Sequence, residues 1–324
     1  MAERGYMGLL LIGDPHLEGR IPGFRRDDYP NVILQKLTWA LDYAEDHRLL
    51  PAILGDLFDK PRDNPNWLLV TLLGILRGRE VLGLYGNHDV HYNPELTEHD
   101  SLQLLVQAGV LKLVSAEAPW NGVMNGRRVV VGGSSYRHEI PATFAAPGPE
   151  VKPSLFSSKP LVIWLTHHDI LCPGYDEGRI KPTEIEGIDV VVNGHIHRRL
   201  EPVVCGGTSW ITPGNISRRS RNDASRQHVP SVLRVDVRAD GYDLDYVTVP
   251  HQPFDEVFHG GVVEILVEEG PSAFVEGLAE LQSRQTAGGA GLIEFLNQNL
   301  NQFEPAVAEE IRRLAGEVTS ESCV

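Results

Sequence analysis

The 324-residue sequence predicts a mixed α/β fold (α+β in part) built on a pair of sheets, on three observations. Short apolar runs rich in β-branched residues recur along the chain and end in turn signals, as buried strands do. Between the first of these runs, apolar residues repeat three and four positions apart, as they do in amphipathic helices. Later, "SVLRVDV" (231–237) and "YDLDYVTV" (242–249) alternate in polarity and predict a hairpin.

The predicted elements follow from these patterns in chain order. A helix is expected after the first strand, where Ile33, Leu37 and Leu41 share one face, and another over Leu68–Leu76. The predicted buried strands are "MGLLLIG" (7–13), "LLPAILG" (49–55), "VLGLYG" (81–86), "RRVVVGG" (127–133), "PLVIWL" (160–165), "IDVVVNG" (188–194) and "SWIT" (209–212). The alternation of strand and helix in the first half favours parallel pairing.

A domain boundary is expected near residue 250, where strand patterns give way to helical ones. We therefore expect a main domain over 1–250 and a helical region over 251–324. In its last segment, Val307, Ile311, Leu314 and Val318 form an apolar stripe. This stripe fits packing against the chain's own core and equally a groove in a partner protein.

Composition narrows the class of protein. The net charge of −15 disfavours a free-standing, nonspecific DNA binder. No segment approaches the roughly 20 apolar residues of a membrane span, and the first apolar stretch reads as a strand rather than a signal peptide. Three widely spaced cysteines favour a reducing compartment, so a cytoplasmic protein without membrane attachment is expected.

Short polar motifs follow five of the predicted strands. They are "GDPH" (13–16), "GDLFD" (55–59), "GNHD" (86–89), "THHD" (166–169) and "GHIH" (194–197). Side chains at positions i and i+2 of an extended segment point the same way, so Asp14 with His16, and His195 with His197, form natural chelating pairs. The preceding glycines let the backbone turn sharply or approach a neighbour closely.

These donors indicate a metal centre. Carboxylate, carboxamide and imidazole groups suit Mn²⁺, Fe²⁺ or Zn²⁺ without a thiolate. A carboxylate between two histidine-rich halves bridges two ions about 3.5 to 4 Å apart, and Asp56 is the candidate bridge. Each motif alone is a weak signal, since a single loop histidine is more often solvated. The ordered set of five is a strong one.

The ordered set "GDPH…GDLFD…GNHD…THH…GHIH" resembles the signature of calcineurin-like metallophosphoesterases, over roughly residues 7–215. The resemblance implies a four-layer αββα sandwich and hydrolysis of phosphoesters at two divalent ions, Mn²⁺ being the first choice. It also implies that one ion is held by Asp14, His16, Asp56 and His197, and the other by Asp56, Asn87, His167 and His195.

The resemblance further implies that His88 protonates the leaving oxygen and that Asp89 orients it. A purely positioning role for His88 is the alternative. His168 is a rival to His167, because either aligns with a single family histidine.

Finer features point to the substrate. "GDLFDKPRDNP" (55–65) and "TPGNISRRS" (212–220) resemble segments of the SbcD/Mre-type DNA repair nucleases, although Asn215 replaces the family's serine. This implies a Mn-dependent DNA exo- or endonuclease whose C-terminal helices bind an SMC-like coiled-coil ATPase of the SbcC type. The region after 250 is short for that family's capping domain.

Both the substrate and the role of a group of arginines have an alternative interpretation. The first alternative is a metallophosphodiesterase for small nucleotides or other phosphoesters, with the C-terminal helices as a lid or a homodimer contact. The arginines near the last motif form either a basic rim for DNA or an ordinary solvated loop; they are Arg198, Arg199, Arg218, Arg219, Arg221 and Arg226.

Overall fold

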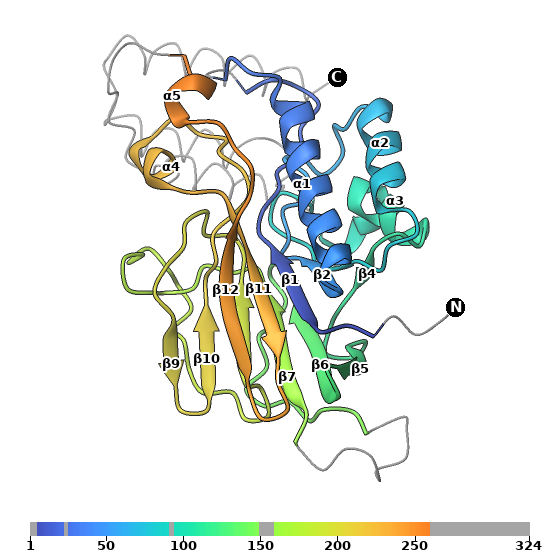
Figure 1. Ribbon diagram of the computed structural model, residues 1–324, viewed down its shortest axis with the longest axis vertical. Helices are drawn as coiled ribbons and strands as arrows, with labels where there is room; N and C mark the ends of the chain where they lie inside the picture. Colours follow the sequence, from blue (N-terminus) through green and yellow to red (C-terminus); the bar gives the residue numbers. More distant parts are fainter. Residues whose placement is uncertain (1–4, 23–24, 91–93, 149–158, 260–324) are drawn as a thin grey trace, which may run out of the picture. The chain divides into compact units, whose positions relative to one another are not determined.

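The computed structural model describes residues 5–22, 25–90, 94–148 and 159–259, which fold around two six-stranded sheets (Figure 1). The first sheet has the order β12-β11-β1-β2-β3-β4 and the second the order β5-β6-β7-β8-β10-β9. The strands are β1 (Gly8–Ile12), β2 (Leu49–Ile53), β3 (Leu82–Gly83), β4 (Lys112–Leu113), β5 (Trp120–Met124), β6 (Arg127–Ser134), β7 (Leu161–Thr166), β8 (Val190–Asn193), β9 (Val203–Cys205), β10 (Thr208–Ile211), β11 (Ser231–Val237) and β12 (Tyr242–Thr248).

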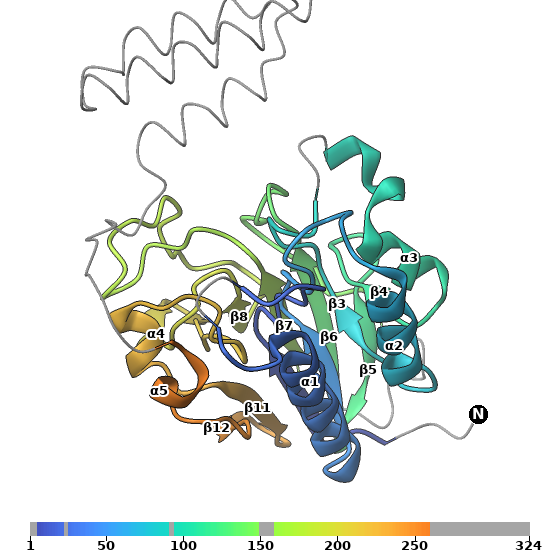
Figure 2. The same cartoon turned by 90° about the horizontal axis from the view of Figure 1, so that it is seen from above.

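The helices are α1 (Tyr29–Asp46), α2 (Asn66–Leu76), the 3₁₀ helix η1 (Pro94–His99), α3 (Ser101–Gln107), α4 (Asp223–Gln227) and α5 (Phe254–Val257). Seen from above, α1, α2 and α3 lie together along one side of the sheets (Figure 2). No helix within the described ranges combines the length and the hydrophobicity that a membrane crossing requires.

Because the central strands of each sheet are parallel, their carboxyl ends lie at the same end of the sandwich. In the first sheet, β1 pairs in parallel with β2, and β2 with β3. In the second sheet, β7 pairs in parallel with β6 and β8, and β8 with β10. At the margin of the first sheet, β11 and β12 form the predicted antiparallel hairpin.

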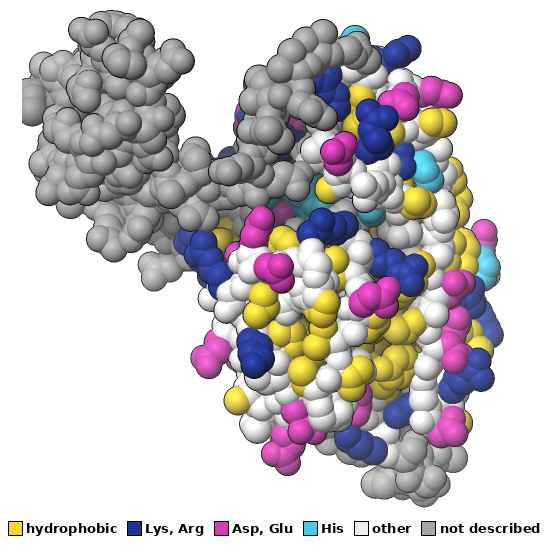
Figure 3. All heavy atoms as spheres, turned by 90° about the vertical axis from the view of Figure 1, so that its left-hand side faces the viewer, with side chains coloured by type: hydrophobic (Ala, Val, Ile, Leu, Met, Phe, Trp, Pro, Cys, Tyr) yellow, Lys and Arg dark blue, Asp and Glu magenta, His cyan; other side chains and the backbone are white. Residues whose placement is uncertain are grey.

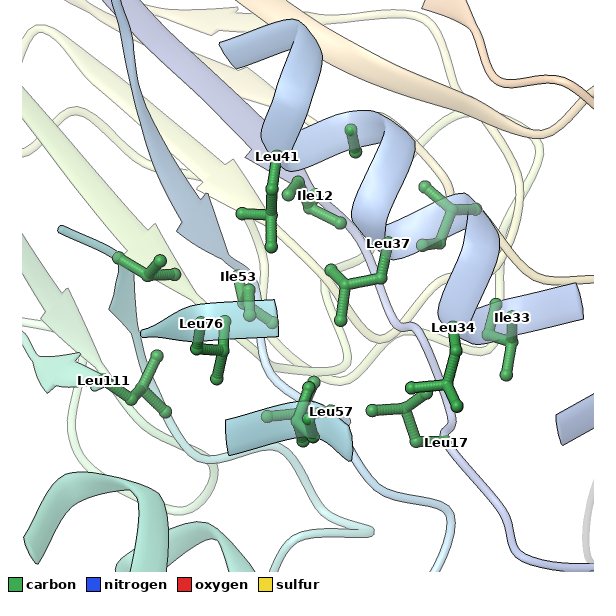
Figure 4. Packing of buried hydrophobic residues seen from close by; sticks show 14 of the residues in the cluster. Ile12, Leu17, Ile33, Leu34, Leu37, Leu41, Ile53, Leu57, Leu76 and Leu111 are labelled. Atoms are coloured by element: carbon green, nitrogen blue, oxygen red, sulfur yellow. The ribbon is translucent and has the colours of Figure 1, made fainter. Parts of the chain in front are cut away.

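Successive side chains of β1 point to opposite faces of the first sheet and so belong to two different hydrophobic cores. Leu9 and Leu11 pack between the sheets, where they meet inward-facing residues of β6, β7 and β8 such as Val131 and Ile163. Their neighbours Leu10 and Ile12 point to the other face of the first sheet, onto which α1 and α2 pack. Figure 4 shows Leu34, Leu37 and Leu41 of α1, Leu76 of α2 and Ile12 and Ile53 of the sheet in this second core.

The outer face of the second sheet carries a third core. Val162, Trp164 and Val191 contribute to it from the strands. Among the described residues, its cover comes from loop residues such as Ile170 and Ile185.

The predicted fold class is confirmed: two mixed sheets are flanked by helices in an α/β sandwich. Strands β4, β5 and β9 and helix α3 were not predicted, because β4 and β9 are very short and β5 carries a glycine in place of an alternating apolar residue. The division near residue 250 stays a prediction. Within the described part, Phe254, Val257 and Phe258 of the following segment form a small buried cluster. The helical segments predicted after residue 260 lie outside the described residues.

Candidate metal centre

The five polar motifs follow β1, β2, β3, β7 and β8, so their side chains meet at one end of the sandwich. Open α/β sheets bind ligands at the carboxyl ends of their parallel strands. The two sheets lie face to face, and each contributes part of the donor set. The first sheet presents the residues up to Asp89, and the second presents the three predicted histidine ligands of the later motifs.

The local backbone differs from the extended pairs that the sequence predicts. Asp14, His16, Asp56 and His195 have φ angles of 38°, 48°, 47° and 70°, in the left-handed region that residues with a Cβ seldom adopt. Each such residue costs on the order of 1–3 kcal/mol and persists only where its surroundings hold it in place. The extended geometry on which the pairing of these residues was predicted is therefore not the geometry of the loops.

Two glycines allow the loops to approach one another. A Cβ on Gly86 would lie 2.1 Å from Oδ1 of Asp56, and a Cβ on Gly55 would lie 2.5 Å from Nδ1 of His167. Gly55 also has a φ of 90°, which favours glycine. The expected role of these glycines in close approach is what the structure shows.

The first group of donors contains Asp14, His16, Asp56 and His197, whose ligand atoms all lie within 4.8 Å of one another. Nε2 of His16 lies 2.9 Å from Nε2 of His197 and 3.6 Å from Oδ2 of Asp56. Oδ1 of Asp14 lies 3.9 Å from Nε2 of His197. Three of these side chains are buried, and the His197 ring is half exposed.

The second group contains Asp56, His167 and His195, with Asn87 among them. Nε2 of His167 lies 3.3 Å from Oδ2 of Asp56 and 3.0 Å from Oδ1 of Asn87. Nδ1 of His195 lies 2.9 Å from the same Asn87 oxygen. Asp56 belongs to both groups, so its carboxylate could contact an ion in each of them.

The donor atoms fit divalent cations better than they fit one another. Oδ2 of Asp14 and Nδ1 of His16 are buried and have no hydrogen-bond partner among the residues that the structure describes. Unpaired buried polar atoms are rare and point to a ligand or a functional demand. The His16 and His197 nitrogens approach each other closely although a neutral pair supplies one proton at most, whereas a cation accepts both lone pairs.

The pKa values of the donor residues reflect the concentration of negative charge in the cluster. Burial favours the neutral form of His167, but the Asp56 and Asp14 carboxylates overcome this and raise its pKa to about 9. Burial, with the nearby Asp56 charge, raises the pKa of Asp14 to about 7. For Asp56, burial opposes ionisation, yet His167 and His16 hold its pKa below the ordinary range. Without cations, these shifts favour the protonated forms of His167 and Asp14.

The rivalry between His167 and His168 is decided by geometry. His167 points its Nε2 into the second group, while its Nδ1 lies 2.7 Å from the carbonyl oxygen of Leu54. His168 uses Nδ1 on the Thr166 hydroxyl and Nε2 on the carbonyl oxygen of His138, 2.9 Å away. His168 is therefore a structural residue of the second sheet's loop.

His88 lies at the open side of the centre. Its side chain is 37% exposed, and its ring stacks edge-on against His16 with centroids 4.8 Å apart. Its Nδ1 is 2.9 Å from the carbonyl oxygen of Asp59, which leaves Nε2 as the nitrogen for proton transfer. This placement suits a group that delivers a proton to a bound substrate.

Asp89 was expected to contact the His88 ring, but Asp59 is the residue that lies beside it. The Asp89 carboxylate accepts hydrogen bonds from the backbone N–H groups of Leu57, Phe58 and Gly86, and so joins two loops rather than orienting His88. Asp59 lies with Oδ1 3.6 Å from Nδ1 of His16 and 3.8 Å from Nδ1 of His88. Its place in "GDLFD" was visible in the sequence, but the spacing alone did not indicate which histidine it would face.

Asp169 is a second residue that the sequence analysis did not assign. Its Oδ1 lies 2.8 Å from Nε2 of His195 and accepts from the Tyr175 hydroxyl at 3.2 Å. A carboxylate on the outer nitrogen of a ligating histidine sets its tautomer and ring orientation. Asp169 follows the histidine pair in "THHD", which was the available signal.

The arginines do not form one basic rim. Arg219 reaches the centre, with Nη2 2.8 Å from Oδ2 of Asp59. Arg218 is buried, Arg199 lies over the Tyr246 ring, and Arg226 pairs with Asp255. On the face that Figure 3 shows, basic and acidic side chains are interspersed.

A model of the calcineurin-like phosphoesterase family matches residues 7–199. Among solved structures, the chain is similar to TT1561 of Thermus thermophilus, with 14% identity, a TM-score of 0.40, and coverage of 74% of this chain and 97% of that one. A conserved protein of Streptococcus pneumoniae, described as a predicted phosphoesterase, has 11% identity, a TM-score of 0.32 and coverage of 76% and 92%. Vps29 of Chaetomium thermophilum has 13% identity, a TM-score of 0.29 and coverage of 75% and 98%. A search of curated proteins found no match.

Proposed function

Because the chain belongs to the calcineurin-like phosphoesterase family, we propose that it is a phosphodiester hydrolase that cleaves DNA at a centre of two divalent ions, most favourably Mn²⁺. The observation that carries the hydrolase proposal is the position of Asp56. Its Oδ2 lies 3.6 Å from Nε2 of His16 and 3.3 Å from Nε2 of His167, between the two donor groups. Two cations held there would neutralise phosphate oxygens and lower the pKa of a bound water.

The chain's own residues supply positioning and proton transfer. The backbone N–H of His88 donates to Oδ1 of Asp56 at 2.7 Å, so the proposed bridge and the proposed acid are directly linked. With Nδ1 held by the Asp59 carbonyl, His88 presents Nε2 toward the substrate and transfers its proton to the leaving oxygen.

A hollow of about 290 Å³ near the centre supports a nucleic-acid substrate. Its walls include Arg20, Lys60, Arg62 and the exposed ring of Trp67. Asp63 lies 3.6 Å from both Arg20 and Lys60, and Asp100 pairs with Arg62, so a phosphate backbone would compete with these carboxylates. Cationic groups that follow a phosphate backbone, together with an aromatic face for base stacking, are the usual elements of single-strand contact. Glu18 lines the same hollow and lies 3.4 Å from Nε of Arg219, which also contacts Asp59 of the centre.

The SbcD/Mre-like segments extend the proposal to a nuclease subunit of a DNA repair complex. In this proposal the helical segments predicted after residue 260 bind an SMC-like coiled-coil ATPase. The resemblance of "GDLFDKPRDNP" and "TPGNISRRS" to those nucleases is its support.

A small-substrate phosphodiesterase is the second candidate function. The dispersal of Arg199, Arg218 and Arg226 away from the centre favours it, because a long duplex requires an extended basic surface.

The test compares substrates with the purified full chain and Mn²⁺. Linear duplex DNA, single-stranded DNA and bis-p-nitrophenyl phosphate are offered to the natural chain and to His88→Ala. Cleavage of DNA that disappears in the variant supports the nuclease proposal. Turnover of the small ester with DNA left intact, even after the cognate ATPase and ATP are added, overturns it in favour of the second candidate.

A further inference from the structure

A second cluster of buried polar groups lines a hollow of about 460 Å³ outside the metal centre, between the start of α1 and the segment before α5. Arg25, Lys36 and Arg218 line it and are only 5%, 6% and 7% exposed. Charged residues are seldom buried to this degree unless they are paired. Three buried cations around one hollow raise the question of which groups compensate their positive charge.

The hydrogen bonds of these cations use only part of their N–H donors and do not balance their charge. Arg25 pairs with Asp27, with Nε 2.8 Å from Oδ1 and Nη2 2.6 Å from Oδ2. Lys36 donates to the carbonyl oxygen of Ile216 at 2.9 Å, and Arg218 donates to the carbonyl oxygens of His228 and Gln252. Asp27 is the one carboxylate among the described residues that line the hollow. Within the described ranges, Arg218 and Lys36 are left without a carboxylate partner at this hollow.

The surrounding titratable groups respond to this excess. Burial, reinforced by Arg25 and Arg218, lowers the pKa of Lys36 to about 7 although Asp27 opposes the change. The nearby His228 and His251 also have lowered pKa values, for which burial is the main cause and Arg218 and Lys36 are contributors. The hollow thus resists further positive charge.

The walls define the shape of a ligand. Trp39 and Val32 of α1 and Val257 of α5 provide apolar surface, and the exposed residue Gln35 lies at the rim. A volume of about 460 Å³ lies within the range of roughly 300–1,000 Å³ typical of small-molecule sites. The cationic groups are buried and the polar residues at the rim are uncharged. A ligand would therefore bind with its anionic group inside the hollow and its apolar part against Trp39, Val32 and Val257.

We propose that this hollow is a binding site for a small phosphomonoester, whose dianionic phosphate lies among Arg25, Lys36 and Arg218. A phosphomonoester carries about −1.5 to −2 charges at pH 7, which matches the charges of Arg218 and of Lys36 once Lys36 has taken up a proton on binding. Its three terminal oxygens accept hydrogen bonds from donors that arrive from three directions. A ring on the ester stacks against the Trp39 wall.

The site is chemically separate from the metal centre although it adjoins the same loops. The N–H of Ile216 donates to the carbonyl oxygen of Gly13 at 3.1 Å, next to Asp14, while the Ile216 carbonyl faces Lys36. The metal centre presents buried carboxylates, which oppose the binding of a phosphate when no cation is bound. A second cationic hollow, lined by Arg20, Lys60 and Trp67, also remains in metal-free protein, so binding is assigned to the present hollow by its response to the Gln35 and Lys36 variants below.

The experiment uses the full chain, stripped of metal with a chelator that is then dialysed away. Adenosine 5′-monophosphate, inorganic phosphate and adenosine are titrated by calorimetry. We expect one site per chain for the monophosphate, weaker binding of phosphate, and no binding of adenosine. Repeating the titration in buffers of different ionisation enthalpy should show proton uptake as Lys36 becomes fully charged.

Charge changes at the rim give a test that misfolding cannot imitate. Gln35→Lys should tighten binding of the monophosphate and Gln35→Glu should weaken it, each by about 3- to 10-fold, because a charge near a surface site interacts by roughly 1 kcal/mol. Lys36→Met should weaken it by about 10- to 100-fold, as the loss of a charged hydrogen bond does. The exposed Arg77, which follows α2 and does not line the hollow, provides the control variant Arg77→Gln with unchanged affinity.

The proposal is overturned if metal-free protein shows no saturable binding of the monophosphate at millimolar concentration, or if the two Gln35 variants change affinity in the same direction. Neither result bears on hydrolysis at the metal centre, which is measured separately with Mn²⁺ present.

Discussion

The metal centre and the cationic hollow are both clusters of buried polar groups, and they lie on the two sides of the loops at Gly13 and Ile216. In the centre, acceptor atoms face one another, so that Oδ2 of Asp14 and Nδ1 of His16 are left without partners among the described residues. In the hollow, every cation donates to a carboxylate or a carbonyl. The first arrangement lacks positive charge and the second lacks negative charge.

The contrast shows that burial alone does not determine what a polar cluster binds. Desolvation is the largest influence on Asp14 and on Lys36, and it raises one pKa to about 7 and lowers the other to about 7. The sign of the uncompensated charge decides the ligand: divalent cations in the centre and an oxyanion in the hollow. The following variants test each side of this comparison.

Removal of Asp56 should have the largest effect. Because its carboxylate belongs to both donor groups, Asp56→Ala should lose both ions and, with them, several kcal/mol of transition-state stabilisation, about 10³-fold in rate or more. Metal content by atomic emission and Mn²⁺-dependent hydrolysis measure the two losses. Asp240→Ala, at an exposed carboxylate, is the control. Two ions retained by Asp56→Ala would show that Asp56 is not shared.

Substitution of His88 should separate chemistry from metal binding. His88→Ala should keep both ions but hydrolyse DNA about 10²- to 10⁴-fold more slowly, the usual contribution of a general acid. The loss should be smaller for bis-p-nitrophenyl phosphate, because nitrophenolate leaves without needing a proton. The exposed His99 provides His99→Ala as a control with unchanged rates. Equal losses on both substrates would point to a positioning role instead.

Asp169 should have an intermediate effect, confined to the second donor group. Its carboxylate lies 2.8 Å from Nε2 of His195, so Asp169→Ala should weaken one of two Mn²⁺ sites by about 10- to 100-fold, and Asp169→Asn by less. Calorimetric titration with Mn²⁺ resolves the two sites. Asp176→Asn, at an exposed neighbour, should leave both affinities unchanged. If Asp169→Ala binds Mn²⁺ as the natural chain does, the carboxylate does not support His195.

The smallest effect is expected in the pH dependence of stability from the hollow. Folding lowers the pKa of Lys36 from 10.5 to about 7, so between these values the unfolded chain holds a proton that the folded chain lacks. This group therefore makes stability rise with pH across that window, by at most about 1.4 kcal/mol per pH unit, and has no influence on the slope below it.

Lys36→Met should lose this part of the slope. Urea unfolding of both proteins between pH 7 and pH 9, without phosphate, measures the difference in the free energy of unfolding. A difference that stays constant with pH would mean that Lys36 keeps an ordinary pKa in the folded chain.

Much of the architecture could be predicted because period-2 and period-3.6 patterns report directly on burial. Leu9 to Ile12 read as a buried strand, and Ile33, Leu37 and Leu41 read as one helix face; the structure has both. Strand β9 and helix α3 are short, and their residues carry little periodicity, so they depend on tertiary pairing and packing. The segments after residue 260 stay predictions.

The sequence by itself determined which residue types stand at the strand ends, since a motif such as "GHIH" after an apolar run is a local feature. Only the tertiary structure decided which of them meet: His167 rather than His168, and Asp59 rather than Asp89 beside His88. It alone brought Arg25, Lys36 and Arg218 together around a hollow. The physical reason is that charged groups interact over a few ångströms in space. The number of residues between two such groups in the sequence does not determine that distance.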